Sequence, residues 1–229
     1  TEMTIEFQGG EPLLAFDLVK QGVEGALARN RQYGRHLTFV VCTNLSLLSD
    51  EILEYCRRHE ILLSSSLDGP SSIHNANRRL ARSDSYDAFV VGLDRARAVL
   101  GHSRVSALMT TTRRSLGHAQ QIIDAYLENG FDQIFLRDIN PYGFAVRGRG
   151  HADHTTEEFL QFFKEALDYI LSLNKAGTRF VEVYSSIILR KILTPFNDGF
   201  VDLQSPSGLI NSVVVYNYDG SVYCSDESR

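Results

Sequence analysis

The sequence predicts an α/β fold in which helices cover a parallel sheet, and two observations carry that prediction. Segments with strand character alternate with segments of helical periodicity five times in the first 170 residues. Several strand segments, such as residues 37–42, are near-continuous apolar runs, which are typical of strands buried on both faces of a parallel sheet. This alternation is expected in a barrel or in an open doubly wound sheet.

The first two units follow directly from residue spacing. In the stretch 4–8, Ile5 and Phe7 alternate with polar residues as in a strand, and helical spacing follows over 13–30. Residues 37–42 form the next predicted strand. Ser49 is expected to cap the helix over 52–59, because its side chain can accept a hydrogen bond from the first turn.

Three further units complete the pattern. The predicted strands cover 61–66, 104–109 and 133–136, and the predicted helices cover 86–100, 119–129 and a long segment after residue 155. Residues 70–85 are expected to form a polar loop. Gly130 is expected to end one helix at its C′ position, and Thr155 with Glu158 forms a capping box at the start of another.

The pattern changes after Gly177. Residues 180–184 are predicted as a sixth strand and residues 187–193 as a short helix. The stretch 213–223 is predicted as a hairpin with an Asp219-Gly220 turn. We therefore divide the chain into a core over residues 1–198 and the beginning of a second, truncated module over residues 199–229.

Composition limits the class of protein. The chain has 229 residues, 43% of them hydrophobic, and a net charge of −5. This is enough apolar material for one globular core, and the negative charge argues against a nucleic-acid-binding surface. No apolar run approaches the length of a membrane span, and the N-terminus does not resemble a signal peptide. A soluble cytoplasmic protein without a nucleic-acid or membrane partner is expected.

The cysteines argue against a disulfide framework. There are three, Cys42, Cys56 and Cys224, with no CxxC pair. Cys42 lies in an apolar run and Cys56 on an amphipathic helix, so both are expected to be small core residues.

The end of the first predicted strand, Gln8-Gly9-Gly10-Glu11-Pro12, has the features of a ligand site. Two glycines allow a ligand to approach the backbone closely, and the free backbone groups there can pair with an amino-acid-like ligand. Glu11 adds a carboxylate suited to an ammonium group. The alternative is an ordinary tight turn in which Glu11 is a favourable acid near a helix N-terminus.

Polar residues also follow the other predicted strands. They are Thr43-Asn44, Ser66 to Asp68, Thr110 to Thr112, and Arg137-Asp138. In parallel α/β folds, ligands bind at the carboxyl ends of the strands. We therefore expect these residues and the Gln8–Glu11 stretch to converge on one site.

Two stretches taken together resemble radical S-adenosylmethionine enzymes of the peptide-modifying branch. They are Phe7-Gln8-Gly9-Gly10-Glu11-Pro12, and Ser66-Leu67-Asp68-Gly69-Pro70 followed by Ile73-His74-Asn75 and Arg78. The segment Asp219-Gly220-Ser221-Val222-Tyr223-Cys224 is similar to the opening of that branch's C-terminal auxiliary-cluster (SPASM) module. More narrowly, residues 201–208 and 216–227 look like the B-type maturase of the His-Xaa-Ser system (HxsB).

The resemblance implies a partial (β/α) TIM-like barrel of the radical SAM type, followed by a small β-hairpin module. In the family, the first β/α unit carries a CxxxCxxC motif that binds a 4Fe-4S cluster, and this chain has no such motif. The simplest interpretation is an excerpt that lacks the first unit, so that the cluster ligands lie upstream and these residues alone are inactive. A natural cluster-free relative is the alternative.

Cofactor contacts follow from the resemblance, position by position. Gly9 and Gly10 would offer backbone groups to the methionine ammonium of S-adenosylmethionine, with Glu11 beside it, and Gln8 is a plausible ribose partner. Ser66 and Asp68 would reach the ribose or the carboxylate, and Arg78 would pair with the carboxylate, for which a guanidinium is suited. An ordinary turn at 66–70 and a surface position for Arg78 are the alternatives. His74 is expected to orient a loop.

Cys224 resembles a ligand of an auxiliary iron–sulfur cluster. The family commonly has an earlier cysteine where this chain has Ser205 and Ser207 around Pro206. An isolated cysteine in a hairpin is the alternative.

The resemblance implies reductive cleavage of S-adenosylmethionine to a 5′-deoxyadenosyl radical that abstracts hydrogen from a peptide or a small precursor protein. An electron donor and a paired second maturase are the other implied partners. No general acid or base is assigned. Arg137 and Asp138 stand at a strand end where one could act, but a local ion pair between them explains them equally well.

Two other classes remain open. One is a phosphate- or nucleotide-binding α/β enzyme, although Glu11 would repel the anion. The other is a cluster-free peptide-binding module.

Overall fold

The computed structural model describes residues 2–80, 84–139, 154–196, 200 and 213–224. The strands are β1 Glu2–Phe7, β2 His36–Cys42, β3 Leu62–Ser66, β4 Val105–Thr111, β5 Gln133–Ile134, β6 Leu136–Asp138, β7 Val181–Glu182, β8 Val215–Tyr216 and β9 Val222–Tyr223. The α-helices are α1 Phe16–Asn30, α2 Asp50–Arg58, α3 Ser71–Asn77, α4 Ser85–Leu100, α5 Ala119–Glu128, α7 Thr156–Lys175 and α8 Val183–Leu193. Short 3₁₀ helices are η1 Pro12–Ala15, η2 His102–Arg104 and η3 Arg113–Ser115.

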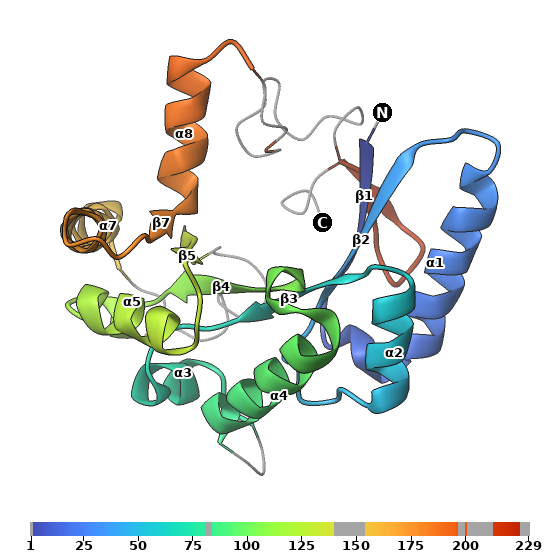
Figure 1. Cartoon of the computed structure of the whole chain (residues 1–229), viewed down its shortest axis with the longest axis horizontal. Helices are drawn as coiled ribbons and strands as arrows, with labels where there is room; N and C mark the ends of the chain where they lie inside the picture. Colours follow the sequence, from blue (N-terminus) through green and yellow to red (C-terminus); the bar gives the residue numbers. More distant parts are fainter. Residues whose placement is uncertain (1, 81–83, 140–153, 197–199, 201–212, 225–229) are drawn as a thin grey trace.

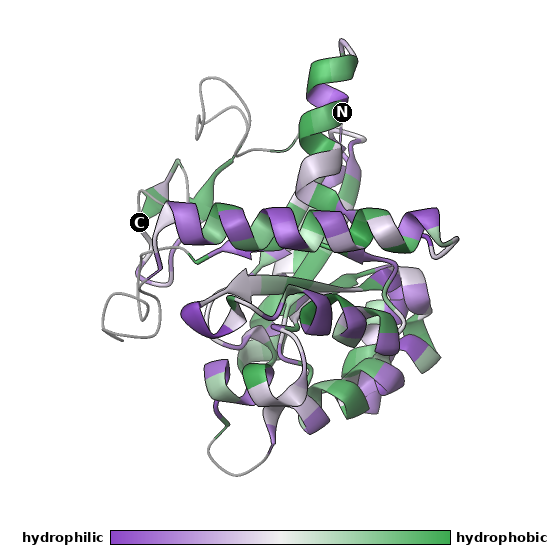
Figure 2. Cartoon of the chain, turned by 90° about the vertical axis from the view of Figure 1, so that its left-hand side faces the viewer, coloured by the Kyte–Doolittle hydropathy of each residue, from purple (hydrophilic) through white to green (hydrophobic). Residues whose placement is uncertain are grey.

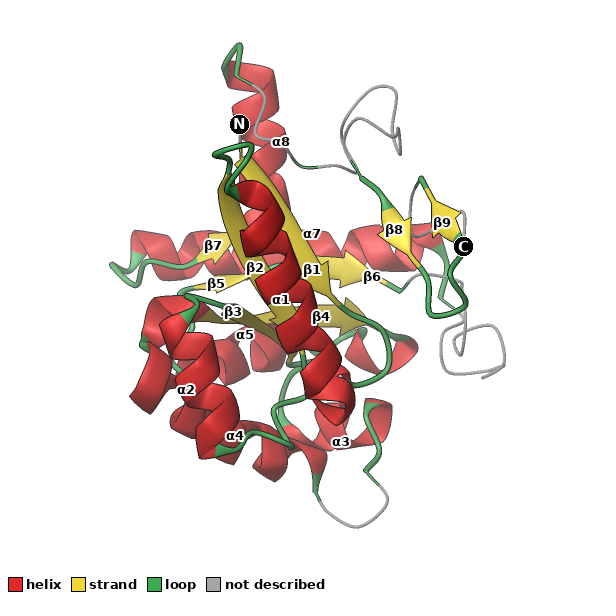
Figure 3. Cartoon of the chain, turned by 90° about the vertical axis from the view of Figure 1, so that its right-hand side faces the viewer, coloured by secondary structure: helices red, strands yellow, loops and turns green. Residues whose placement is uncertain are grey.

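Five strands form one parallel sheet in the order β1-β2-β3-β4-β6. The order follows the chain without the reversal that defines a doubly wound sheet, so successive units wind in one direction. The sheet curls, and its covering helices lie along the outside of the curl (Figures 1 and 3). The prediction of an α/β fold with a partial barrel is therefore confirmed.

The two faces of the sheet differ in chemistry. Residues that point to the helices are largely apolar and buried, as with Val41, Leu63 and Met109, each of which has no exposed surface. The alternate residues form the opposite side, here called the inner face. By register it consists of Glu2, Thr4, Glu6, His36, Thr38, Val40, Cys42, Leu62, Ser64, Ser66, Ser106, Leu108, Thr110 and Arg137. The inner face is mainly polar and partly exposed.

Helix ends follow the capping chemistry of the sequence. The Ser49 hydroxyl accepts a hydrogen bond from the backbone N–H of Ile52. Thr155 and Glu158 form the predicted reciprocal capping box before α7. Hydrophobic and hydrophilic residues alternate along this helix (Figure 2), and its apolar side is buried against the core. Gly130 has φ +72°, as expected for a residue that ends a helix in the left-handed region.

Three predictions of local structure are wrong. The expected polar loop at 70–85 contains helix α3, in which buried His74 packs against the rings of Tyr86 and Phe89. The fifth strand is broken: β6 continues the main sheet, whereas β5 pairs with β7. The sixth strand has only two residues.

Helix α8 begins at Val183 because of the residue before it. The Glu182 carboxylate accepts hydrogen bonds from the backbone N–H groups of Tyr184 and Ser185. Val183 and Tyr184 were predicted to be strand but lie in the helix, so the cap overrides their β preference. Helix α8 has no buried residue and extends away from the rest of the core (Figures 1 and 2).

The cysteines divide into two environments. Cys56 is fully buried in the core as predicted, and burial raises the pKa of its thiol to about 12. Cys42 is not a core residue. It lies on the inner face, half-buried, and its thiol donates a hydrogen bond to Glu6 Oε1 at 3.2 Å.

The predicted hairpin is present as β8 and β9, which pair antiparallel around a turn with Gly220 at φ +85°. The boundary expected near residue 199 falls where the structure describes only Phe200 between residues 196 and 213, so it stays a prediction. No described helix is long and apolar enough to cross a membrane.

Candidate functional site

The site begins at the turn after β1. Gly9 and Gly10 have φ values of +91° and +57°, a region that glycine enters without steric cost. A Cβ built on either residue meets nothing within 4 Å, so open space lies beside this backbone. Gln8, immediately before them, is exposed at the end of the strand. The turn therefore leaves room for a ligand to approach the main chain.

Glu11 ties this turn to the end of the neighbouring strand. Its Oε1 accepts hydrogen bonds from the Thr43 hydroxyl at 2.7 Å and from the Leu13 N–H at 3.1 Å, and its Oε2 accepts from the Asn44 N–H at 2.8 Å. Thr43 in turn accepts a hydrogen bond from the Leu45 N–H at 3.1 Å. The carboxylate thus caps η1 and fixes the ends of β1 and β2 relative to each other.

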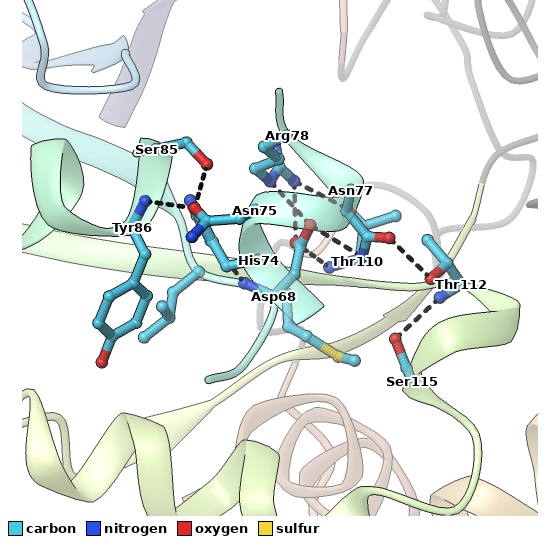
Figure 4. A network of polar contacts seen from close by, with 12 residues as sticks. Asp68, His74, Asn75, Asn77, Arg78, Ser85, Tyr86, Thr110, Thr112 and Ser115 are labelled. Carbon is cyan, nitrogen blue, oxygen red and sulfur yellow. Dashed lines mark hydrogen bonds and ion pairs between the residues drawn. The ribbon is translucent and has the colours of Figure 1, made fainter. Parts of the chain in front are cut away.

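A second cluster lies at the ends of β3 and β4 (Figure 4). Asp68 is buried, with 1% of its surface exposed. Its two carboxylate oxygens accept from Arg78 Nε at 2.9 Å and Nη2 at 3.0 Å, which is the bidentate geometry of a strong ion pair. They also accept from the Thr110 N–H at 3.2 Å and the Asn77 side chain at 3.3 Å.

Two buried side chains, His74 and Tyr126, hold the backbone around Asp68 in place. His74 Nδ1 accepts a hydrogen bond from the Asp68 N–H at 3.3 Å, and burial lowers the pKa of this histidine, which favours the neutral ring that can accept. The Tyr126 hydroxyl donates to the Leu67 carbonyl at 2.8 Å. His74 orients this segment, as expected, although from a helix rather than from a loop.

Arg78 brings its guanidinium to the inner face. Its Nη2 lies 3.5 Å from the Thr110 hydroxyl, and Thr110 is an inner-face residue. Among the described residues, Nη1 makes no hydrogen bond and no ion pair. One edge of the guanidinium is therefore used by Asp68, and the other is available to a ligand. Ser66, at the end of β3, is half-buried on the same face.

The predicted residues thus lie at one edge of the sheet but in two clusters. Gly9, Gly10 and Glu11 form the cluster at β1 and β2, and Asp68 with Arg78 forms the cluster at β3 and β4. Within the described parts of the chain no hydrogen bond joins them directly. Backbone bonds in the intervening strands connect them, including Thr43 N–H to the Ser64 carbonyl at 2.9 Å.

Arg137 and Asp138 do not form the local ion pair considered from the sequence. Asp138 Oδ1 lies 2.6 Å from His154 Nε2 and accepts from the Ile139 N–H at 2.8 Å. Arg137 is exposed on the inner face beside Thr110, its register partner. In the described part of the chain it has no hydrogen bond or ion pair.

Cys224 follows β9 and is exposed. No group of three or more His, Cys, Asp or Glu side chains among the described residues could hold a metal ion. Ser205 and Ser207, where an earlier cysteine was expected, lie outside the described residues, as do residues 201–208 and 225–227 of the narrower resemblance. The auxiliary cluster stays a prediction.

Sequence reasoning missed some supporting residues. Asn77 bridges Asp68 and the Thr112 hydroxyl, which lies 3.2 Å from Asn77 Oδ1. Tyr126 was read only as a position in a helix. An amide side chain directly before Arg78 was the available signal for Asn77, whereas the contact of Tyr126 with a turn 59 residues away has no local signal.

Comparison with protein families and curated sequences gives relatives but no family model. No family model matches the chain. An uncharacterized protein of Methanothermobacter thermautotrophicus is 30% identical over 174 residues, which cover 71% of this chain and 63% of that protein. A cysteine-type anaerobic sulfatase-maturating enzyme of Clostridium perfringens is 24% identical over 226 residues, covering 96% of this chain and 58% of the enzyme. The chain therefore spans about three fifths of these relatives.

Solved structures share the fold. The enzyme anSMEcpe with bound AdoMet matches with a TM-score of 0.77 and 23% identity over 97% of this chain and 57% of that one. Its complex with AdoMet and the Kp18Cys peptide matches with a TM-score of 0.75 and 21% identity, over 98% and 61% of the two chains. SuiB of Streptococcus suis bound to precursor peptide SuiA matches with a TM-score of 0.53 and 16% identity. The match covers 76% of this chain and 36% of SuiB.

One sequence relative is a sulfatase-maturating enzyme, and the solved structures confirm the partial-barrel fold. They do not test the narrower resemblance to the B-type maturase of the His-Xaa-Ser system.

Proposed function

We propose that this chain is the S-adenosylmethionine-binding core of a radical enzyme that modifies a peptide or a small protein. The observation that carries the proposal is the open Gly9-Gly10 turn at the same sheet edge as the Asp68–Arg78 pair, in a fold shared with a sulfatase-maturating enzyme whose structure contains AdoMet. When bound, the cofactor supplies a hydrogen-abstracting 5′-deoxyadenosyl radical after reduction by a 4Fe-4S cluster.

The residues fit the amino-acid end of this cofactor. An ammonium group needs hydrogen-bond acceptors, and the Gly9-Gly10 backbone offers carbonyl groups where no side chain blocks the approach. A carboxylate needs paired donors, and Arg78 has an unused edge of its guanidinium among the described contacts. We assign Gln8 and Ser66 to contacts with the ribose. Asp68 holds Arg78 in position and compensates its charge.

Glu11 has a similar supporting role in this proposal. Three donors already engage its oxygens, so it stabilises the turn and contributes negative charge near the ammonium. That charge also disfavours a phosphate at the start of η1, which argues against the nucleotide-binding alternative.

The cluster and the remaining partners belong to the full-length protein. The chain lacks a CxxxCxxC motif, so the proposal assigns the 4Fe-4S ligands to residues outside it. A peptide substrate is supported by the neighbours solved with the Kp18Cys peptide and with SuiA. An electron donor, a paired second maturase and an auxiliary cluster at Cys224 are included in the proposal. So is the finer identity as a B-type maturase of the His-Xaa-Ser system, which only the sequence motifs support.

The first test is the iron and acid-labile sulfide content of the full-length protein purified without oxygen. About four irons per chain is expected for the radical cluster, and more would support an auxiliary cluster. No iron after reconstitution would contradict the radical mechanism and favour the cluster-free peptide-binding alternative.

The second test is S-adenosylmethionine affinity, measured by calorimetry on the same preparation. Glu11→Ala and Arg78→Ala are each expected to weaken binding about tenfold or more, because each removes a charge from the site. Glu51→Ala and Arg58→Ala are matched controls, since these side chains are 80% and 66% exposed on α2. Wild-type affinity in both site variants would overturn the assignment of the cofactor site.

A further inference from the structure

We propose that Arg137 binds a carboxylate of the peptide substrate, so that the enzyme selects substrates with an acidic side chain near the modified residue. This inference rests on the proposed function and adds a substrate class to it. It starts from a positive charge on the inner face that no described residue compensates.

The register places Arg137 on that face. Leu136 pairs with Met109, and both are buried against the helices, with 2% and 0% of their surfaces exposed. Arg137 pairs with Thr110, one position further along each strand, so its side chain points to the opposite side. Its side chain is exposed.

Among the residues that the structure describes, none forms a hydrogen bond or ion pair with the Arg137 guanidinium. Asp138 interacts with His154 and Ile139, and its register partner Thr111 is completely buried, which puts Asp138 on the other face. The acids of the described inner face, Glu2 and Glu6, belong to β1 at the far edge of the sheet. Within the described contacts, all guanidinium donors of Arg137 are therefore left for a ligand.

Arg78 also lies beside Thr110, but its charge is compensated by a described residue, unlike that of Arg137. Its guanidinium is held by Asp68 through two hydrogen bonds, so the pair has no net charge. A ligand near Thr110 would therefore face two arginines. Arg78 is held and neutralised by Asp68, whereas no described acid pairs with Arg137 on β6. A second carboxylate would pair with Arg137, because a guanidinium binds carboxylates in a bidentate manner.

The cofactor and the substrate could each supply that carboxylate. The distance between β1 and β6 in the sheet favours the substrate as the source of the carboxylate that Arg137 binds. The turn assigned to the cofactor ammonium follows β1, while Arg137 lies on β6, four strand spacings away, each about 4.8 Å along the sheet. The ammonium and carboxylate of one amino acid are carried by the same carbon atom, so the nearer Arg78 is the better partner for the cofactor.

The test uses the full-length protein, reconstituted with iron and sulfide and saturated with S-adenosylmethionine. A displayed library of random twelve-residue peptides is selected for binding to the wild type, Arg137→Glu, Arg137→Lys and the control Arg58→Glu on the outer helix α2. The wild type, Arg137→Lys and Arg58→Glu should enrich Asp and Glu. Arg137→Glu should lose that enrichment and favour Lys and Arg, because the charge at the site is reversed.

Two quantitative arms separate the possible sources of the carboxylate. A selected acidic peptide should bind Arg137→Gln about tenfold more weakly than the wild type, and its Asp→Asn or Glu→Gln analogue should bind both proteins equally. S-adenosylmethionine affinity should stay within about twofold of wild type in Arg137→Gln, which also shows that the variant is folded.

Three results would overturn the inference: no acidic enrichment by the wild type, the same enrichment by Arg137→Glu, or a tenfold loss of cofactor affinity in Arg137→Gln with unchanged peptide selection. The last would assign the carboxylate to the cofactor. Absence of cofactor binding by the wild type is a separate outcome, because it contradicts the proposed function itself.

Discussion

Gly92 is the position where a single methyl group is expected to disturb the candidate site from a distance. It lies in α4, where the loop after β2 packs against the helix. A Cβ on Gly92 would lie 2.6 Å from Leu45 Cβ and 2.8 Å from the Leu45 carbonyl oxygen. Normal contacts between such atoms are about 3.5–4.0 Å, so the loop has to move by roughly 1 Å.

The loop cannot move cheaply. Leu45 has φ +64°, is 2% exposed, and donates its N–H to the same Thr43 hydroxyl that holds Glu11. Overpacking a core typically costs about 1–3 kcal/mol, and the gain in helix propensity from glycine to alanine is about 1 kcal/mol. Because the contacted atoms belong to a fixed backbone, we expect Gly92→Ala to lower the free energy of unfolding by about 1–2 kcal/mol.

Two other helical glycines provide matched controls for this substitution. A Cβ on Gly25 meets nothing within 4 Å, so Gly25→Ala should stabilise the protein by about 0.5–1 kcal/mol. A Cβ on Gly22 would lie 2.8 Å from the Phe7 ring, which can shift, so Gly22→Ala should fall between the other two. Only Gly92→Ala should also weaken S-adenosylmethionine binding, because it displaces Leu45 and through it Thr43 and Glu11.

Thermal unfolding and calorimetry of the full-length protein measure both effects. At about 2–4 °C per kcal/mol, the melting temperature should fall by roughly 2–8 °C in Gly92→Ala and rise by a few degrees in Gly25→Ala. Equal melting temperatures for these two variants would refute the packing argument. A destabilised Gly92→Ala with unchanged cofactor affinity would refute the connection from Leu45 to the site.

Other predictions concern titration, reactivity and capping. Burial lowers the pKa of His74 in the folded state, so its stabilising effect is complete above the ordinary histidine pKa of about 6.5 and is lost as the pH falls through the folded value. His74→Gln should therefore reduce the loss of unfolding free energy between pH 7.5 and 5.5, measured by urea titration. Iodoacetamide at pH 8 should label exposed Cys224 and leave Cys56 unmodified until urea is added, as read by peptide mass spectrometry, because burial raises the pKa of the Cys56 thiol to about 12. Thr155→Ala should lower the unfolding free energy by about 1 kcal/mol, and unchanged stability would contradict the role of the capping box.

The architecture could be predicted because it depends on local signals. Apolar runs of strand length alternate with helical periodicity, and caps such as Ser49 and Thr155 mark where helices start. The failures have a common cause in tertiary contacts. Helix α3 has seven residues, too few to be stable by propensity, and it forms because His74 packs between Tyr86 and Phe89.

In the candidate site, too, the sequence predicted some residues from local motifs but not their partners in the fold. The motifs identified Glu11, Asp68 and Arg78, and the structure places them at one edge of the sheet. The partners of the two carboxylates come from other strands, as with Thr43 for Glu11 and Thr110 for Asp68. Those pairings depend on strand order and register, which residue spacing alone did not establish.

The contacts also change what the motif residues are expected to do. A carboxylate that already accepts from several donors has little capacity left for a ligand, and this applies to Asp68 with four donors and Glu11 with three. Removing either carboxylate would leave its donors unpaired and shift the groups they carry. The groups that contact the amino-acid end of the cofactor are then the Gly9-Gly10 backbone and the open edge of Arg78. The two acids act by positioning them, so that variants of Asp68 or Glu11 should alter protein stability and cofactor affinity together.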